Sequence, residues 1–258
     1  VASHRPGQRA RAVATYRADE NDGRAFAQAP TGIGKTLSTL FPAVKALGLG
    51  HVEKLFYLTA KTIGRTVAEK AVEDMRSEGL QLKSLTLTAR DKICFKPNGG
   101  TRCDTEQCPF AIGYFDRIND ALQDAFEHDA FTRPLIEEYA QKHQVCPFEF
   151  SLELSLWSDL IICDYNYVFD PRAHLKRFFE EEGGQYAFLV DEAHNLVDRA
   201  REMFSADLYK SEILGVRRLV AKEQPSLGKL LGDINKYLLG VGKKVEGEGG
   251  GSAWIDPK

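Results

Sequence analysis

The sequence predicts an α/β fold built on a parallel β-sheet. Three observations predict it: short apolar runs are each followed by a helix or a loop, a glycine-containing turn precedes the first of these helices, and one apolar run ends in two acidic residues. Strands that alternate with helices are typical of parallel sheets, because each parallel pair needs a crossover connection.

Four apolar runs are the expected strands, and they span residues 24–29, 54–59, 159–163 and 186–190. The last two are the kind of short apolar run that is buried on both faces of a sheet. We expect one helix to begin near Thr36 and another to span about 64–78, where Gly79 ends it.

The middle of the chain differs from the rest. Residues 91–150 combine Cys, Pro and Gly with amphipathic helices, and we expect no clear strand there. One expected helical face consists of apolar residues at helical spacing, namely Phe115, Ile118, Leu122 and Phe126. We therefore predict a mainly helical insertion that divides an α/β domain into residues 1–90 and 151–199. Residues 200–258 are predicted to be helical again.

The composition limits the classes of protein to which the chain can belong. It has 258 residues, of which 43% are hydrophobic and 28% charged, and its formal net charge is −3. These values argue against disorder and against a histone-like polycation. No run reaches the roughly 18 apolar residues of a membrane helix. Five cysteines without signs of secretion favour a reducing, cytoplasmic location.

A glycine-containing turn matches most of a phosphate-binding loop. It comprises Ala29, Pro30, Thr31, Gly32, Ile33, Gly34, Lys35 and Thr36. Ala29 replaces the first glycine of the pattern G-x-x-x-x-G-K-[ST]. Gly32 and Gly34 let the backbone curl around phosphates. Lys35 supplies a charge for the β- and γ-phosphates of a triphosphate, and the Thr36 hydroxyl can ligate Mg²⁺. The alternative is an ordinary turn before a helix, but the expected strand and helix on either side favour phosphate binding.

Two carboxylates follow the last expected strand, in the run Val-Asp-Glu-Ala-His that ends at His194. Ligands of α/β folds bind at the carboxyl edge of the sheet, where these side chains would lie. We expect Asp191 to hold Mg²⁺ and Glu192 to polarise the attacking water, with His194 as a hydrogen-bonding coupler. The alternative is a helix N-terminus that carries favourable acidic residues.

The phosphate loop and the Asp-Glu-Ala-His run together resemble superfamily-two helicases, and more narrowly the DinG/XPD type of iron–sulfur DNA helicases. This resemblance implies a RecA-like domain, ATP and Mg²⁺, and single-stranded and forked duplex DNA as partners. It also implies 5′→3′ unwinding, a second RecA-like half, and a helical arch that begins in residues 200–258. We therefore expect the chain to be an N-terminal part of a longer helicase.

Further segments resemble elements of the same family. Arg5 and Gln8 resemble an adenine-side element, although a surface loop is an equal alternative. Thr59, Thr62 and Arg65 resemble a first DNA-contact element, in which hydroxyls and a guanidinium suit phosphates, although Thr62 also suits a helix N-cap.

Two basic residues and a tyrosine-rich run complete the resemblance. Arg90 resembles a basic residue that precedes the first cluster cysteine of the family, and both Arg90 and Lys92 could follow a DNA backbone. The run Asp-Tyr-Asn-Tyr-Val-Phe-Asp-Pro, residues 164–171, also resembles a family signature, and aromatic packing is its expected role.

Four cysteines lie in the expected insertion: Cys94, Cys103, Cys108 and Cys146. Structural zinc sites usually have pairs two to four residues apart, and only one gap here is that short. The spacing alone leaves a [4Fe–4S] cluster, zinc and free thiols open, whereas the resemblance implies the cluster. Such a cluster would staple a segment with little core of its own. Cys163 is expected to be a core thiol.

Two other functions remain open from the residues alone. The chain could be a nucleotide- or DNA-binding module without turnover. It could also be a zinc-stapled ATPase unrelated to DNA.

Overall fold

The computed structural model describes residues 7–21, 23–28, 34–96 and 103–247. The chain divides into two compact units, residues 1–203 and 204–258. Among the described helices, none is long and apolar enough to cross a membrane.

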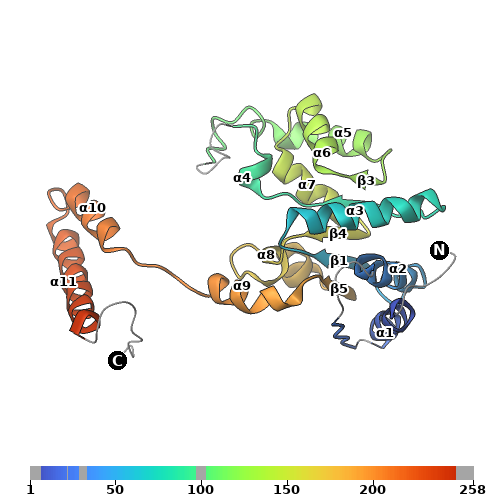
Figure 1. Ribbon diagram of the computed structural model, residues 1–258. Helices are drawn as coiled ribbons and strands as arrows, with labels where there is room; N and C mark the ends of the chain where they lie inside the picture. Colours follow the sequence, from blue (N-terminus) through green and yellow to red (C-terminus); the bar gives the residue numbers. More distant parts are fainter. Residues whose placement is uncertain (1–6, 22, 29–33, 97–102, 248–258) are drawn as a thin grey trace. The chain divides into compact units, whose positions relative to one another are not determined.

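The larger unit contains a five-stranded parallel sheet in the order β3-β2-β4-β1-β5 (Figure 1). The strands are β1 (Lys54–Leu58), β2 (Ser84–Thr86), β3 (Ala130–Phe131), β4 (Leu160–Cys163) and β5 (Tyr186–Val190). Leu58 pairs with both Cys163 and Val190, so β1, β4 and β5 end together at one edge of the sheet. The predicted α/β class and three of the predicted strands are confirmed.

The inserted region contributes a strand of its own, which corrects the expectation that 91–150 holds none. β3 pairs in parallel with β2, through Ser84 with Ala130 and Leu85 with Phe131. These strands are only three and two residues long. Their apolar pattern is too short to be recognised without the partner strand.

The strand expected at 24–29 is wrong for its described part. Residues 24–28 have no regular structure, and Phe26 is 94% exposed. The alternating positions Ala25 and Ala27 offer little apolar area, so burial of this segment gains little free energy.

Each face of the sheet carries a hydrophobic core, because neighbouring side chains of a strand point to opposite faces. On one face, Tyr57 packs in a core with residues of α2 (Lys35–Gly48) and α3 (Thr62–Ser77). On the other face, Phe56 packs in a core that includes Phe150. Burial of one such large side chain stabilises the fold by about 1.5–3 kcal/mol.

Three helices of the inserted region belong to this second core. They are α5 (Tyr114–Ala125), α6 (Arg133–His143) and α7 (Pro147–Leu156), which lie together with β3 in Figure 1. The predicted apolar face of α5 is wrong at Phe115, which is 86% exposed. The buried face instead contains Tyr114, Ile118, Ala121 and Ala125. The small alanines let α5 approach its neighbours closely. The buried face of α5 is therefore shifted by about one residue from the face that the large apolar side chains predicted.

Short elements complete the larger unit: α1 (Gln8–Glu20), α4 (Arg90–Ile93), α8 (Asn166–Phe169), a π-helical segment (Arg177–Glu182), a 3₁₀ turn (Ala193–Asn195) and α9 (Leu196–Met203). Helix α1 packs against α2, where Arg11 donates a hydrogen bond to Ser38 Oγ at 2.9 Å. The smaller unit contains two helices packed on each other, α10 (Lys210–Val220) and α11 (Pro225–Gly247).

Candidate functional site

The carboxyl edge of the sheet brings the phosphate loop and the acidic run together. Lys35 is the first residue of α2, and Glu192 follows β5. The Lys35 Nζ atom donates a hydrogen bond to Glu192 Oε1 at 3.0 Å. Each side chain is about one-third exposed. The structure therefore places a cation and a carboxylate side by side at a solvent-accessible sheet edge.

The Glu192 carboxylate lies among basic side chains, and Lys35, His194 and Lys61 all lower its pKa. The hydrogen bond from Lys35 holds the pKa of the Glu192 carboxyl below its usual range, and the charges of Lys35 and His194 act in the same direction. His194 Nδ1 lies 3.5 Å from Glu192 Oε2, and the imidazole is 72% exposed. The lowered pKa favours the carboxylate form of Glu192, which is the form that a general base needs.

Tyr57 of β1 connects the two residues expected to hold Mg²⁺. Its buried hydroxyl interacts with the side chains of both Thr36 and Asp191. Burial raises the pKa of Tyr57 most, and the negative charge of Asp191 raises it further. Thr36 and Asp191 therefore share one neighbourhood, and their hydroxyl and carboxylate oxygens are donors of the kind that Mg²⁺ prefers.

Gly34 has a backbone conformation that favours glycine and lies close to the Gln8 side chain. Its φ is +76°, a left-handed conformation that side chains disfavour. A Cβ atom at Gly34 would also lie 2.4 Å from Gln8 Nε2. The amide of Gln8 thus reaches the end of the phosphate loop. Arg5 and residues 29–33 lie outside the described residues.

The expected DNA-contact residues differ in accessibility. Thr59 is only 2% exposed and packs so closely on Gly64 that a Cβ there would lie 2.1 Å from Thr59 Oγ1. Thr62 is exposed and is the first residue of α3, so the N-cap is Lys61. Arg65 forms a partly buried ion pair of 3.8 Å with Asp164.

Arg90 and Lys92 are exposed residues of α4, at the start of the inserted region. The Arg90 guanidinium stands 4.6 Å from the centre of the Phe148 ring and 3.2 Å from Glu149 Oε1. The backbone carbonyl of Lys92 accepts a hydrogen bond of 2.6 Å from Arg133. These contacts leave the Lys92 ammonium exposed.

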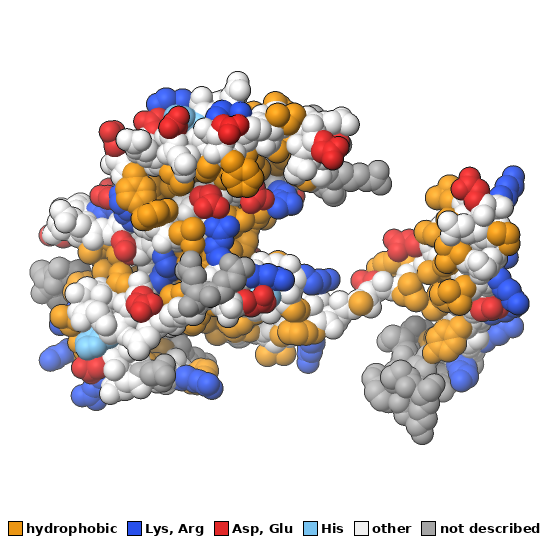
Figure 2. Space-filling view, turned by 180° about the vertical axis from the view of Figure 1, so that it is seen from behind, with side chains coloured by type: hydrophobic (Ala, Val, Ile, Leu, Met, Phe, Trp, Pro, Cys, Tyr) orange, Lys and Arg blue, Asp and Glu red, His pale blue; other side chains and the backbone are white. Residues whose placement is uncertain are grey.

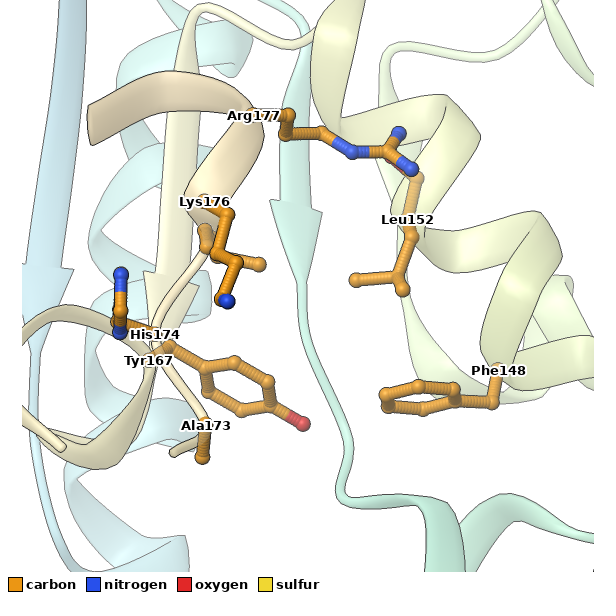
Figure 3. Close-up of a pocket in the computed structure, with 8 residues that line it drawn as sticks. Phe148, Leu152, Tyr167, Ala173, His174, Lys176 and Arg177 are labelled. Atoms are coloured by element: carbon orange, nitrogen blue, oxygen red, sulfur yellow. The ribbon is translucent and has the colours of Figure 1, made fainter. Parts of the chain in front are cut away.

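A pocket of about 290 Å³ lies between α7 on one side and α8 with the segment that follows it on the other (Figure 3). It is lined by Phe148, Leu152, Tyr167, Ala173, His174, Leu175, Lys176 and Arg177. In Figure 3, Phe148 and Leu152 face Tyr167 and Lys176 across the opening. The sequence analysis missed this pocket, because its walls come from two segments with no shared pattern. The run of basic residues followed by two phenylalanines at 176–179 is the one local signal near this pocket.

Charges over the larger unit are mixed in sign. On the face shown in Figure 2, basic and acidic side chains are interspersed. Any attraction for a polyanion must therefore come from local groups rather than from the net charge of −3.

The four cysteines of the insertion differ in burial. Cys108 is buried, Cys94 and Cys146 are partly buried, and Cys103 is exposed. Within the described ranges, no three His, Cys, Asp or Glu side chains are gathered closely enough to hold one metal ion. Cys163 is fully buried in β4, and burial raises the pKa of its thiol.

Three of the cysteine-bearing segments are nevertheless held at one corner of the insertion. The rings of Phe95 and Phe110 are 5.0 Å apart, which joins the segment after Cys94 to that after Cys108. Burial raises the pKa of Cys146 most, and the charge of Cys94 acts in the same direction. Thiolates are the donor type that iron–sulfur clusters use, so the chemistry of these residues suits such a cluster.

Arg117 ties two of these segments together. Its guanidinium donates to the carbonyls of Pro109 and Ile112, next to Cys108, at 3.3 and 2.7 Å. It also donates to the carbonyls of His143 and Gln144, just before Cys146, at 3.1 and 2.7 Å. The protein thus brings these two cysteine loops together through its own hydrogen bonds.

The comparisons with known proteins agree with this geometry. The sequence model of the DEAD_2 family matches residues 59–213, more than half of the chain. The chain belongs to the DEAD_2 family. This DEAD_2 chain is 22% identical over 223 residues to the general transcription and DNA repair factor IIH helicase subunit XPD of Dictyostelium discoideum, covering 74% of this chain and 28% of the relative.

Other relatives of the DEAD_2 chain carry helicase names. It is 26% identical to the XPD subunit of Schizosaccharomyces pombe, over 88% of this chain and 32% of the relative. It is 25% identical to a regulator of telomere elongation helicase 1 homolog of Drosophila persimilis, over 71% of this chain and 19% of the relative. The chain thus spans about a third or less of the length of these relatives, and the resemblance to XPD-type helicases is confirmed.

Solved structures confirm the RecA-like α/β fold of the DEAD_2 chain. An XPD helicase structure matches with a TM-score of 0.63 at 19% identity, over 90% of this chain and 40% of the other. A truncated XPD structure matches with a TM-score of 0.60 at 18% identity, over 87% of this chain and 64% of the other.

Proposed function

We propose that the protein containing this chain is an ATP-dependent DNA helicase that translocates on single-stranded DNA and unwinds forked duplexes. The observation that carries the proposal is the 3.0 Å contact between Lys35 and Glu192 at the carboxyl edge of a parallel sheet. Membership of the DEAD_2 family and the helicase names of the relatives support it.

In this proposal, the chain supplies one half of the ATP site. Lys35 binds the β- and γ-phosphates, and the other nucleotide-binding residues proposed from the sequence are Gly34, residues 29–33, Arg5 and Gln8. The attacking water donates a hydrogen bond to the Glu192 carboxylate, which orients this water toward the γ-phosphate. His194 couples to Glu192 at 3.5 Å.

Thr36 and Asp191 would hold Mg²⁺ in this site. The ion would neutralise charge that develops on the phosphate oxygens. The arrangement around Tyr57 supports this role, because both side chains act on the same buried hydroxyl.

We propose that DNA follows exposed groups on both parts of the larger unit. Thr62, Arg90 and Lys92 supply accessible hydroxyl and cationic groups, and the pocket adds Lys176 beside aromatic rings. Bases stack on aromatic rings while cations contact phosphates, which suits a single strand. The buried Thr59 and the paired Arg65 would support the neighbouring backbone in this path.

The proposed domain arrangement follows the predicted boundaries. Residues 1–90 and 151–199 form the RecA-like domain, 91–150 form the cysteine-bearing insertion, and 200–258 begin a helical arch. In the insertion, Cys94, Cys103, Cys108 and Cys146 would hold a [4Fe–4S] cluster, which supplies folding energy through metal–thiolate bonds.

Hydrolysis tests the catalytic part of the proposal. DNA-stimulated ATPase activity and fork unwinding are measured on the protein that contains this chain. Lys35→Ala is expected to abolish both, whereas the control Lys45→Ala, on the same helix but stacked on Tyr16, leaves them unchanged. Undiminished turnover by Lys35→Ala would refute the ATP site. Binding of ATP and DNA by the wild type without any turnover would identify a binding module instead.

Metal analysis tests the cluster separately. Protein purified without oxygen is expected to contain about four irons and to absorb broadly near 400 nm. Stoichiometric zinc without iron would show that the cysteines hold a structural zinc ion instead of an iron–sulfur cluster. That result would not affect the ATPase proposal.

A further inference from the structure

The tyrosine-rich run at 164–171 contacts the turn that carries Glu192. Tyr165 is fully buried, in the second core described above. Its hydroxyl donates hydrogen bonds to the backbone carbonyl of Asp191 and, at 3.2 Å, to the carbonyl of Glu192. A side chain from the loop after β4 thus holds the backbone of the acidic run.

The turn that Tyr165 holds is strained. Glu192 has a φ of +51°, a left-handed conformation that is unfavourable for a residue with a Cβ atom. Such conformations persist where surrounding contacts enforce them. Asn195 contributes too, because its backbone N–H and its Nδ2 atom each donate to the Glu192 carbonyl at 3.0 Å.

The direction of the Glu192 side chain depends on this backbone conformation. With Glu192 in the left-handed region, its carboxylate meets the Lys35 ammonium at 3.0 Å. A return to the extended or right-handed region would redirect the Cα–Cβ bond and carry the carboxylate away from Lys35. The hydroxyl of Tyr165 therefore acts on Glu192 through two carbonyl groups, without touching the carboxylate.

We propose that Tyr165 is a positioning residue for ATP hydrolysis, whose hydroxyl fixes the left-handed turn that aims the Glu192 carboxylate. This inference rests on the proposed ATPase function and gives the tyrosine-rich run a role beyond aromatic packing. Asp164 anchors the same run from the other side, because it accepts a hydrogen bond of 3.0 Å from Arg199 and pairs with Arg65.

The test is Tyr165→Phe in the protein that contains this chain. The substitution keeps the buried ring and removes only the hydroxyl. Because small displacements of a catalytic group cost up to about 100-fold in rate, we expect kcat for ATP to fall on the order of tenfold or more. The KM for ATP and the affinity for ADP should change less than about twofold, since Lys35 and the phosphate loop are untouched.

Tyr139→Phe is the matched control. Tyr139 of α6 packs against the same core as Tyr165, but its hydroxyl is hydrogen-bonded to His128 Nε2, at 2.8 Å, instead of to the acidic run. We expect this variant to retain the wild-type kcat. Equal loss of kcat in both variants would show that removal of any tyrosine hydroxyl at this core, rather than release of the turn at Glu192, is responsible, and would overturn the inference.

A double-mutant cycle with Glu192 distinguishes a positioning role of Tyr165 from a purely structural role. In a Glu192→Gln background, Tyr165→Phe should not lower the residual rate further, because its effect passes through the missing carboxylate. A full additional loss in that background would overturn the inference, as would a Tyr165→Phe variant with unchanged kcat. Neither result would affect the proposed function, which fails only if the wild type lacks DNA-stimulated hydrolysis.

Discussion

The Lys35 ammonium and the Glu192 carboxylate are joined by a 3.0 Å hydrogen bond, although the two residues are 157 positions apart in the sequence. The contact joins the start of α2 to the turn after β5. Under the proposed function, phosphate oxygens compete with Glu192 for Lys35. ATP binding would then free the carboxylate to accept a hydrogen bond from water. Nucleotide binding and water activation are thus linked, because Lys35 exchanges its carboxylate partner for phosphate.

Replacement of the carboxylate by an amide tests this exchange. Glu192→Gln should lower kcat for ATP on the order of 100-fold, because the amide is a poor acceptor for the proton of water. Nucleotide affinity should be equal or higher, because Lys35 no longer has an ionic partner to leave. Single-turnover hydrolysis and titration with a fluorescent nucleotide separate the two effects. The control is Glu137→Gln, whose partner is Arg133 on the same helix. Unchanged hydrolysis by Glu192→Gln would contradict the assigned role.

The ion pair also predicts a pH dependence of stability. Lys35 lowers the pKa of Glu192 in the folded protein from its ordinary value of 4.5. The folded state therefore binds fewer protons there than the unfolded state, and the stabilisation is present above about pH 5 and lost as the pH falls through the lowered pKa. Because both side chains are about one-third exposed, we expect less than about 1 kcal/mol.

Urea unfolding of wild type and Glu192→Gln at several pH values measures this contribution. The difference in the free energy of unfolding should be largest near neutral pH and should shrink as the pH falls through the lowered pKa of Glu192. A difference that grew on acidification would have the wrong sign for a lowered pKa.

Alanine substitutions at two glycines with the same φ distinguish the effect of backbone strain from the effect of a steric contact. Gly34 and Gly50 both have φ of +76°, but only a Cβ at Gly34 would meet another side chain, the Gln8 amide. Alanine at either position should cost about 1–2 kcal/mol of stability. Only Gly34→Ala should also weaken ATP binding, because Gln8 must move. Equal nucleotide affinity in both variants would show that the amide plays no part in the site.

Arg117 is predicted to stabilise the cysteine-bearing insertion even without metal. Arg117→Ala removes donors from the Pro109–Ile112 loop and from the carbonyls before Cys146. We expect a loss of roughly 2–3 kcal/mol in the free energy of unfolding and a lower iron content. The control is Arg201→Ala, which removes a 75% exposed side chain of α9. Urea unfolding of metal-free protein isolates the protein contribution, and equal stability of the two variants would contradict the prediction.

The sequence by itself determined the α/β class, the strands now seen at β1, β4 and β5, and the identities of the phosphate-loop and acidic residues. Each of these rests on a local signal, such as an apolar run followed by a turn. The helices of the insertion were predicted in type for the same reason. Within α5, however, the choice of buried face depended on how closely its alanines approach other helices.

Only the tertiary structure decided which of these residues meet. The pairing of Lys35 with Glu192, the burial of Thr59 and the entry of β3 into the sheet all depend on parallel pairing between distant segments. The hydrogen bonds from Tyr165 to the acidic run depend on the same pairing, because β4 and β5 lie on either side of β1 and end at one edge. No periodic sequence pattern predicts such contacts, because they form between segments whose spacing along the sequence is arbitrary.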